Sequence, residues 1–305
     1  MLERVGNSRR AHRLVTSSPA ARDVAMRFIA SETLDGALAT VTTREDQGLL
    51  ATLEPLLPVA HDRETAAHAV DVHLRTLAAV GERRLAPTAD LAVRLTTLGL
   101  STGRGGDRLA AQNLATICRA ARNVDAQVTL DMEDHTTIDA TFAAFSELQQ
   151  DFPGLGVTVQ SQLRRSLVDC RWLATMPTRV RLCKGGYSEP TDVSHNRSSE
   201  IDGAFVRCLA VLMAGKGYPM VATHDPRLVK VAEELADRNQ RTGRDYEFQM
   251  YYGVRPWEHR RLVDTGHQVR VHLPFGTDWY GYLAQRIAER PANVAPLLRA
   301  LVTRR

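Results

Sequence analysis

The sequence predicts an α/β protein of the (βα)8, TIM-like barrel class, and three observations indicate this fold. Eight short apolar runs suited to strands recur along the chain, helical stretches separate most of them, and polar side chains gather where the runs end. Eight strand and helix units over about 250 residues are typical of this barrel. The runs lie at 49–54, 91–95, 127–131, 157–161, 179–184, 219–223, 246–250 and 268–273.

Helices are expected between the strands and before the first one. Residues 1–18 are polar and basic and have the character of a loosely held arm. Apolar side chains on one face then predict a helix from Ser18 to Ile29 and a second from Ser31 to Thr40. We therefore divide the chain into an N-terminal arm with helices, 1–45, and a barrel, 46–305. The barrel helices are expected at 63–83, 107–122, 134–151, 164–175, 199–215, 226–240 and 256–265.

Polar residues follow nearly every expected strand. Because the C-terminal mouth of a barrel is where its chemistry is assembled, we expect these side chains to form one site. An open doubly wound sheet is the alternative fold, but it gives no reason for polar residues at every strand end. They are Arg94 with Thr96, Asp131 with Glu133, Gln160 with Gln162, Arg181 with Lys184, Thr223 with His224 and Asp225, Glu247 with Gln249, and Arg270 with His272.

One of these strands, from Arg179, ends abruptly in Gly185 and Gly186. Alternation along a strand directs Arg181 and Lys184 towards its C-terminal end, and glycine lets a backbone approach a flat or phosphorylated ligand closely. We interpret the stretch as an anion-binding strand end. The alternative is a surface turn that carries two solvated cations.

Composition excludes several classes of function. The net charge is +4 with no basic block, which argues against nucleic-acid binding. The four cysteines (Cys118, Cys170, Cys183 and Cys208) have neither zinc-site nor disulfide-framework spacing. No apolar signal region and no run of about 18 apolar residues is present, so we expect a cytoplasmic protein without a transmembrane segment. No G-x-G-x-x-G motif indicates a Rossmann nucleotide site.

A set of short motifs resembles the proline dehydrogenase family of the monofunctional bacterial type, flavoproteins that oxidise proline to pyrroline-5-carboxylate. The likeness extends from about Arg27 to the C-terminus, and the motifs occur in the family's order and spacing. They are Leu130-Asp131-Met132-Glu133, Gln160, Arg181-Leu182-Cys183-Lys184-Gly185-Gly186-Tyr187, Ala222-Thr223-His224, Glu247-Phe248-Gln249-Met250, Pro274-Phe275-Gly276, and Tyr282 with Arg286 to Asn293.

The resemblance implies a distorted (βα)8 barrel that holds FAD without covalent attachment at the strand C-termini, and no metal. By this likeness Arg181 lies near the flavin N5, and Lys184, Gly185 and Gly186 run along the ribityl and phosphate portion. A cation beside N5 would stabilise reduced flavin, and a lysine with glycine amides suits a pyrophosphate. The remaining cofactor-binding residues implied are Met132, Gln160, Thr223, His224, Gln249 and Glu289.

The family's last helix crosses the barrel mouth and corresponds to residues 277–289 here. Thr277 or Asp278 could cap it. Its members Tyr282, Gln285, Arg286 and Glu289 share one face, which would look towards the flavin. In the family this face carries two consecutive arginines that clamp the substrate carboxylate, together with a tyrosine that packs on the substrate ring.

The substrate shell departs from the family pattern. Gln285 replaces one of the two clamp arginines, and losing such a bond costs roughly 1.5–3 kcal/mol. A family lysine is Arg94, a tyrosine beside the substrate ring is His272, and a leucine is Tyr251. The small alanine after K-G is Gly186, and the glutamate of a closing ion pair aligns with Pro58, although Asp62 or Glu64 could serve instead.

Two explanations of these departures are open. A remote homologue could still oxidise proline, with Arg94 and Arg286 binding its carboxylate. Alternatively, the substrate has changed to hydroxyproline, since His272 can bond a ring hydroxyl, or to a small acyclic secondary amine of a biosynthetic pathway.

Within this framework Asp131 is expected to fix Arg94 and organise the substrate amine, although a purely structural ion pair is nearly as plausible. Arg181 supports the flavin, and by resemblance a quinone or membrane electron carrier accepts the electrons, which implies peripheral membrane contact. Two rivals remain. One is a flavin-binding sensor without turnover, and the other is a metal-dependent lyase or aldolase that uses Asp131, Glu133 and His224 as ligands.

Overall fold

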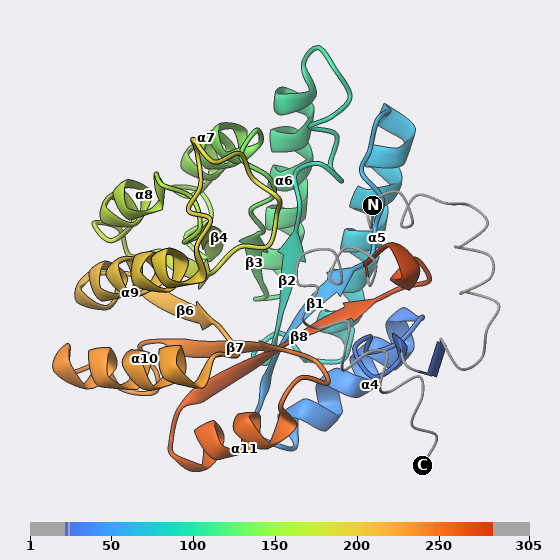
Figure 1. Cartoon of the computed structure of the whole chain (residues 1–305). Coiled ribbons are helices and arrows are strands. Elements are labelled where there is room, and N and C mark those ends of the chain that lie inside the picture. The colour runs from blue at the N-terminus through green and yellow to red at the C-terminus, as the bar shows by residue number, and fades with distance from the viewer. Residues whose placement is uncertain (1–21, 24, 283–305) are drawn as a thin grey trace.

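Eight parallel strands close into a barrel in the computed structural model, which describes residues 22, 23 and 25–282 (Figure 1). Each strand pairs with its successor in the chain, and β8 returns to pair with β1. The predicted fold class is therefore confirmed. The strands are β1 (Leu50–Pro55), β2 (Ala89–Val93), β3 (Gln127–Leu130), β4 (Leu155–Gln160), β5 (Arg179–Cys183), β6 (Tyr218–Ala222), β7 (Glu247–Tyr251) and β8 (Gln268–Phe275).

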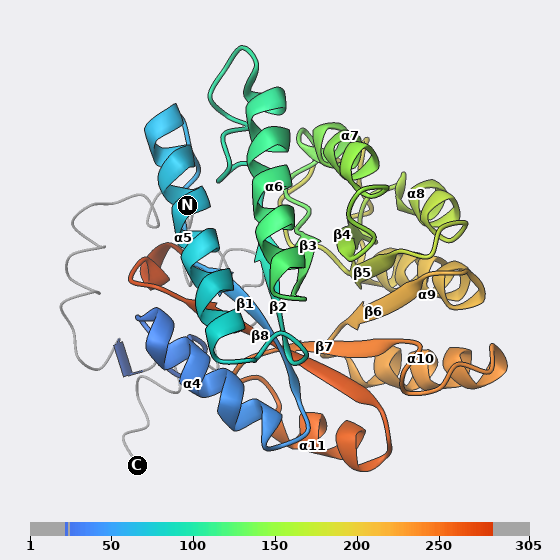
Figure 2. The ribbon, with the colours of Figure 1, turned by 180° about the vertical axis from the view of Figure 1, so that it is seen from behind.

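Helices surround the strands on the outside of the barrel (Figures 1 and 2). α4 precedes β1, and each later helix connects one strand to the next. α4 continues five residues beyond its predicted end at Thr40, and within this extension the hydroxyl of Thr42 donates to the Leu38 carbonyl at 3.3 Å. The helices are α4 (Leu34–Glu45), α5 (Arg63–Glu82), α6 (Gly106–Asn123), α7 (Ile138–Leu148), α8 (Ser166–Leu173), α9 (Ser198–Ala214), α10 (Pro226–Arg238) and α11 (Pro256–Asp264).

The apolar core lies between the strands and these helices. All five positions of β2 are buried, as expected for a parallel strand covered on both faces. On α6 the buried positions Ala110, Leu114, Ile117 and Ala121 recur every three or four residues, which places one stripe of the helix against the barrel. The shell is therefore apolar, and polar side chains are left to the interior of the barrel and its ends.

The barrel interior contains a cluster of four buried charges: Asp90, Arg179, Glu247 and Arg270. We expected Glu247 and Arg270 at the C-terminal mouth, and this was wrong. Glu247 is the first residue of β7, and Arg270 is the third of a strand that continues to Phe275, so both lie deep in the barrel. Arg270 Nε lies 2.7 Å from Glu247 Oε1, and Arg179 Nη2 lies 3.0 Å from Asp90 Oδ2.

The segment before α4 lies beside the end of β8 and the start of the last helix. Ser31 forms a parallel bridge with Phe275, and the Ala30 amide donates to the Pro274 carbonyl at 2.8 Å. A small apolar cluster joins the two parts: Ala25, Ile29, Leu56, Trp279 and Tyr280. This anchors the last helix beside the end of β1.

That helix begins at residue 279, directly after Asp278, and residues 279–282 are helical. Gln285, Arg286 and Glu289, which we predicted to face the flavin, lie outside the described residues. Among the helices of the described part, none is long and apolar enough to cross a membrane.

Candidate active site

Arg181 lies at the centre of the polar residues near the strand ends. Its Nε donates to Gln249 Oε1 at 2.6 Å, and its Nη1 forms an ion pair with Asp131. Nη2 is buried and has no hydrogen-bond acceptor among residues 22, 23 and 25–282. Burial disfavours the charge of Arg181, but Asp131 and Asp90 outweigh burial and raise its pKa. The site thus holds a permanent cation with one nitrogen, Nη2, uncommitted in the described part of the chain.

Asp131 pairs with Arg181 and not with Arg94, contrary to our expectation. Thr158 Oγ1 also donates to Asp131 Oδ1, at 3.2 Å. Arg94 turns instead towards the end of β1, where its Nε lies 3.9 Å from Glu54 Oε1. Arg94 directly follows β2, which lies between β1 and β3, and its side chain turns to the β1 side, whereas the long side chain of Arg181 reaches Asp131 from β5.

Glu54 is the site residue that sequence reasoning did not single out. Its Oε2 lies 2.6 Å from His272 Nε2, so that it joins His272 to Arg94. A signal for Glu54 was present, because it is the last polar residue of the first apolar run.

Asp62, which we considered for a closing ion pair, is the N-cap of α5. It accepts a hydrogen bond from the Thr65 amide at 2.7 Å.

Three rings form a row across neighbouring strands: His224 follows β6, Tyr251 is the last residue of β7, and His272 lies within β8 and not at its end, where we had expected it. The Tyr251 ring stacks on His224, with centroids 5.5 Å apart, and meets His272 edge to face at 5.4 Å. His224 Nε2 accepts from the Tyr251 amide at 2.9 Å. The ring of Tyr251 is therefore fixed between two histidines, which places all three predicted residues together.

The metal-ligand set of the lyase alternative is not assembled. His224 Nε2 already accepts the Tyr251 amide, and Glu133 accepts from the amide and hydroxyl of Thr96 at 3.1 and 2.6 Å. Burial raises the pKa of Glu133, although the hydrogen bonds and Arg94 partly oppose it. Ligand atoms of Glu54, Asp131 and His272 lie within 4.8 Å of one another, but the contacts to Arg181 and Arg94 already neutralise these carboxylates.

Lys184 follows β5 and faces two acids. Its Nζ lies 2.6 Å from Asp202 Oδ1 and 3.0 Å from Asp225 Oδ2. Hydrogen bonds from Arg227 and Lys184 hold the pKa of Asp225 far below its usual range, with the contribution of Arg227 the larger. Gly185 has a φ of +96°, and a Cβ there would lie 2.5 Å from Gln162 Cδ, so this turn requires glycine.

The two predicted cofactor glutamines make protein contacts with their amide groups. Gln160 Nε2 donates to the carbonyls of Met132 and Glu133, at 2.9 and 2.8 Å. Gln249 Nε2 donates to Glu247 Oε1 at 2.5 Å, while its Oε1 accepts from Arg181. Both side chains therefore hold neighbouring parts of the site in place. Thr223 is buried at the end of β6, and its hydroxyl accepts from the Asp225 amide at 3.2 Å.

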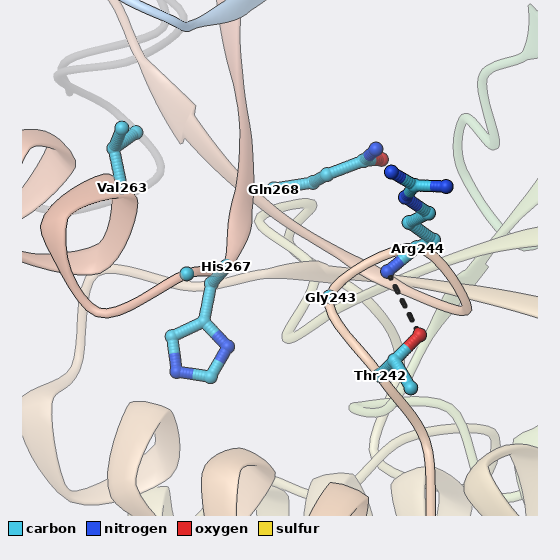
Figure 3. A pocket seen from close by; sticks show the side chains of 7 residues that line it. Thr242, Gly243, Arg244, Val263, His267 and Gln268 are labelled. Atoms are coloured by element: carbon cyan, nitrogen blue, oxygen red, sulfur yellow. Dashed lines mark hydrogen bonds between the residues drawn. The ribbon is translucent and has the colours of Figure 1, made fainter.

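A hollow of about 580 Å³ lies at the opposite end of the barrel, in the loops that precede β7 and β8 (Figure 3). In this hollow the Arg244 amide donates to Thr242 Oγ1 at 3.3 Å. Barrel enzymes build their sites at the C-terminal ends of the strands, so we do not place the active site here. The hollow is lined by Thr242, Gly243, Arg244, Val263, Gly266, His267 and Gln268.

Known proteins of one family resemble this chain along most of its length. The family model described as Proline dehydrogenase matches residues 37–297. Proline dehydrogenase 1 of Bacillus subtilis is 32% identical over 278 residues, which cover 91% of this chain and 90% of that protein. Proline dehydrogenase of Deinococcus radiodurans is 30% identical over 283 residues, with 92% and 90% covered.

Solved structures show the same fold. Proline utilization A (PutA) from Bdellovibrio bacteriovorus matches with a TM-score of 0.81 at 21% identity and covers 88% of this chain. A PutA mutant from Bradyrhizobium japonicum matches with a TM-score of 0.73 at 18% identity and covers 93%. This chain spans about a third of those longer chains, 32% and 33%. The extent of the family match and the identity to whole relatives show that the chain belongs to the proline dehydrogenase family, oxidoreductases that act on the CH–NH group of proline.

Proposed function

We propose that this protein oxidises proline, or a close analogue, at the C–N bond and passes hydride to N5 of a non-covalently bound FAD. The observation that carries the proposal is the buried Arg181, whose Nη2 lacks an acceptor in the described part of the chain. FAD would supply the two-electron acceptor. A quinone or another carrier would then remove the electrons in the second half-reaction.

The residues around Arg181 fit an electron-rich ring. Asp131 and Gln249 each bind one nitrogen of Arg181. The direction of the third nitrogen, Nη2, is therefore already fixed before a ligand binds. A fixed cation in a water-poor site stabilises developing negative charge at little reorganisation cost. Arg181 is therefore suited to support the reduced state of a flavin, and Asp131 is suited to keep Arg181 in place.

The turn after β5 fits the phosphate end. Lys184 contributes a cation beside Gly185 and Gly186, and a turn with positive φ, as at Gly185, is the kind of backbone that can direct amides at an anion. We assign Thr223 and His224 to the same dinucleotide, with Met132, Gln160, Gln249 and Glu289 as further cofactor-side residues. Lys184 would exchange part of its contact with Asp202 and Asp225 for phosphate oxygens.

On the substrate side we assign Arg94, Tyr251, His272, Tyr282, Gln285 and Arg286. A hydroxylated proline is the second candidate substrate, and the contact between His272 and Glu54 favours it. If His272 Nε2–H donates to Glu54, its Nδ1 is left as an acceptor. A ring hydroxyl could donate to that nitrogen, whereas the ring carbons of proline carry no donor.

The visible spectrum of the purified protein tests the proposal. A flavin spectrum is expected, with bleaching when proline or hydroxyproline is added without oxygen. A yellow protein that no secondary amino acid bleaches would support the sensor alternative, and a colourless protein that does not take up FAD would overturn the flavin proposal. Bleaching by hydroxyproline at much lower concentration than proline would select the second candidate.

Replacing His272 with tyrosine is expected to shift the preference from hydroxyproline to proline by about tenfold in the ratio of kcat/KM values. One hydrogen bond of about 1.4 kcal/mol, lost from one substrate only, corresponds to this tenfold change. Steady-state kinetics with both substrates measures the ratio. His68→Tyr, on the exposed face of α5, is the matched control and should leave it unchanged. An unchanged ratio in His272→Tyr would show that His272 does not contact the substrate ring.

A further inference from the structure

We propose that Glu247, which is buried inside the barrel below the site, is a positioning residue for Arg181 and acts through the amide of Gln249. The inference rests on the proposed function, because it assigns to Glu247 a role in presenting Arg181 to the flavin. Glu247 and Gln249 both point into the barrel from β7, since they are two residues apart on one strand.

The three side chains form a directed relay. Glu247 Oε1 accepts from Gln249 Nε2 at 2.5 Å, and Gln249 Oε1 accepts from Arg181 Nε at 2.6 Å. The amide of Gln249 satisfies both neighbours in one orientation only, with NH2 towards the carboxylate and oxygen towards the guanidinium. In the flipped orientation, oxygen would face carboxylate and NH2 would face guanidinium. Glu247 and Arg181 therefore favour the same orientation of the amide, in which Nε2 also lies 3.1 Å from Met220 Sδ, and the carboxylate of Glu247 is the charged acceptor that holds it.

Glu247 is itself held rigidly and remains ionised. Arg270 binds it with two nitrogens, at 2.7 and 3.1 Å from its two oxygens, and Tyr218 OH donates to Oε2 at 3.3 Å. Burial would raise the pKa of Glu247, but Arg270 and Arg179 more than compensate and lower it. The relay thus begins at a fixed negative charge.

The consequence concerns the plane of the Arg181 guanidinium. Gln249 fixes Nε and Asp131 fixes Nη1, and two fixed points on a planar group determine where Nη2 points. Without the carboxylate of Glu247, the amide of Gln249 can flip and the Nε contact is lost. Arg181 would then be less well placed to stabilise anionic reduced flavin, while oxidised flavin, which is neutral at its ring, would be affected less.

The test is the two-electron reduction potential of bound FAD in Glu247→Gln, measured together with the affinity of the apoprotein for oxidised FAD. We expect about tenfold weaker binding of reduced relative to oxidised FAD, which corresponds to a potential about 30 mV more negative. A through-space effect has the opposite sign, because removing a buried carboxylate leaves the site more positive and raises the potential.

Asp90→Asn is the matched control. Asp90 belongs to the same charge cluster, 3.0 Å from Arg179, but no hydrogen bond joins it to Gln249 in the described structure. In Asp90→Asn the reduction potential of bound FAD should rise or stay constant. A second control is Glu247→Gln in a Gln249→Met background, where the relay is already broken and no further lowering is expected.

Three results would overturn the inference: an unchanged or raised potential in Glu247→Gln, an equal lowering in Asp90→Asn, or an undiminished lowering in the Gln249→Met background. If Glu247→Gln does not fold, Glu247→Asp retains the charge beside Arg270 but is too short to reach Gln249 as well, and the same lowering is expected. A wild-type protein that binds no FAD would overturn the proposed function, whereas normal FAD binding with an unaltered potential in the variants would overturn the relay alone.

Discussion

Replacing Arg181 with lysine is expected to lower the rate of flavin reduction by the amine substrate by about 10²–10³-fold, the effect of removing one preorganised donor at a developing charge. Lysine retains the positive charge but cannot reproduce the planar, forked arrangement of N–H donors of the guanidinium group. The ammonium group can neutralise Asp131, and it then cannot also bond Gln249 and present a third donor in a fixed direction. Anaerobic stopped-flow absorbance of the flavin measures this rate.

Arg165→Lys provides the control for this substitution. Arg165 pairs with Asp139 and Asp169 on the outer surface, so the same exchange there should change the rate by less than about twofold. A rate for Arg181→Lys within threefold of wild type, in a protein that binds FAD normally, would show that positive charge alone is sufficient and that the geometry of the guanidinium is not used.

The positions of the strands could be predicted from the sequence because each forms a short apolar run that ends in polar residues. Arg181 and Lys184 illustrate this, since the glycines after them mark the strand end: Arg181 is the third of the five residues of β5, and Lys184 directly follows the strand. Alternation and strand ends are local properties, and a single segment carries enough information to identify them.

The depth of a side chain inside the barrel, by contrast, could not be predicted from the sequence. Alternation indicates that Glu247 and Arg270 point inward, but it does not say how far each lies from the mouth. That depth depends on where the strand begins and on the stagger between strands. β8 continues to Phe275, and Arg270 therefore lies near its beginning and pairs with Glu247.

Which charged side chains form ion pairs across the barrel could likewise not be predicted from the sequence. The pairing of Asp131 with Arg94 was expected from the family resemblance, and the two residues do follow adjacent strands, β3 and β2. Arg181 competes for Asp131 from β5, and Glu54 competes for Arg94 from β1. Such competition is settled by side-chain length and barrel curvature, which appear only when the barrel closes.

Removing Arg270 is expected to have the largest effect on stability. Arg270→Met should lower the free energy of unfolding by about 3–5 kcal/mol, since it leaves Glu247 and Asp90 buried with Arg179 as their remaining arginine in the charge cluster. Urea unfolding at neutral pH measures the change. Arg260→Met removes an exposed ion pair with Asp264 and should change stability by less than about 1 kcal/mol. A similar small loss in Arg270→Met would mean that water or rearrangement solvates the two carboxylates.

The same cluster predicts the direction of acid sensitivity. Burial would raise the pKa of Asp90, but Arg270 and Arg179 bring it down to about 2, below its ordinary value of 3.8. An acid with a lowered folded-state pKa contributes stability at pH above its unfolded value, and this contribution is lost as the pH falls from about 4 towards 2. Without Arg270, burial is opposed less and the folded-state pKa of Asp90 rises. The gap to the unfolded pKa then narrows, so Arg270→Met should lose less stability than the wild type as the pH falls from about 4 towards 2, and unfolding curves between pH 2 and 7 would reveal the difference. If both proteins lost the same amount of stability over this range, Arg270 would not be the main source of the lowered pKa, and Arg179 alone would have to keep Asp90 ionised.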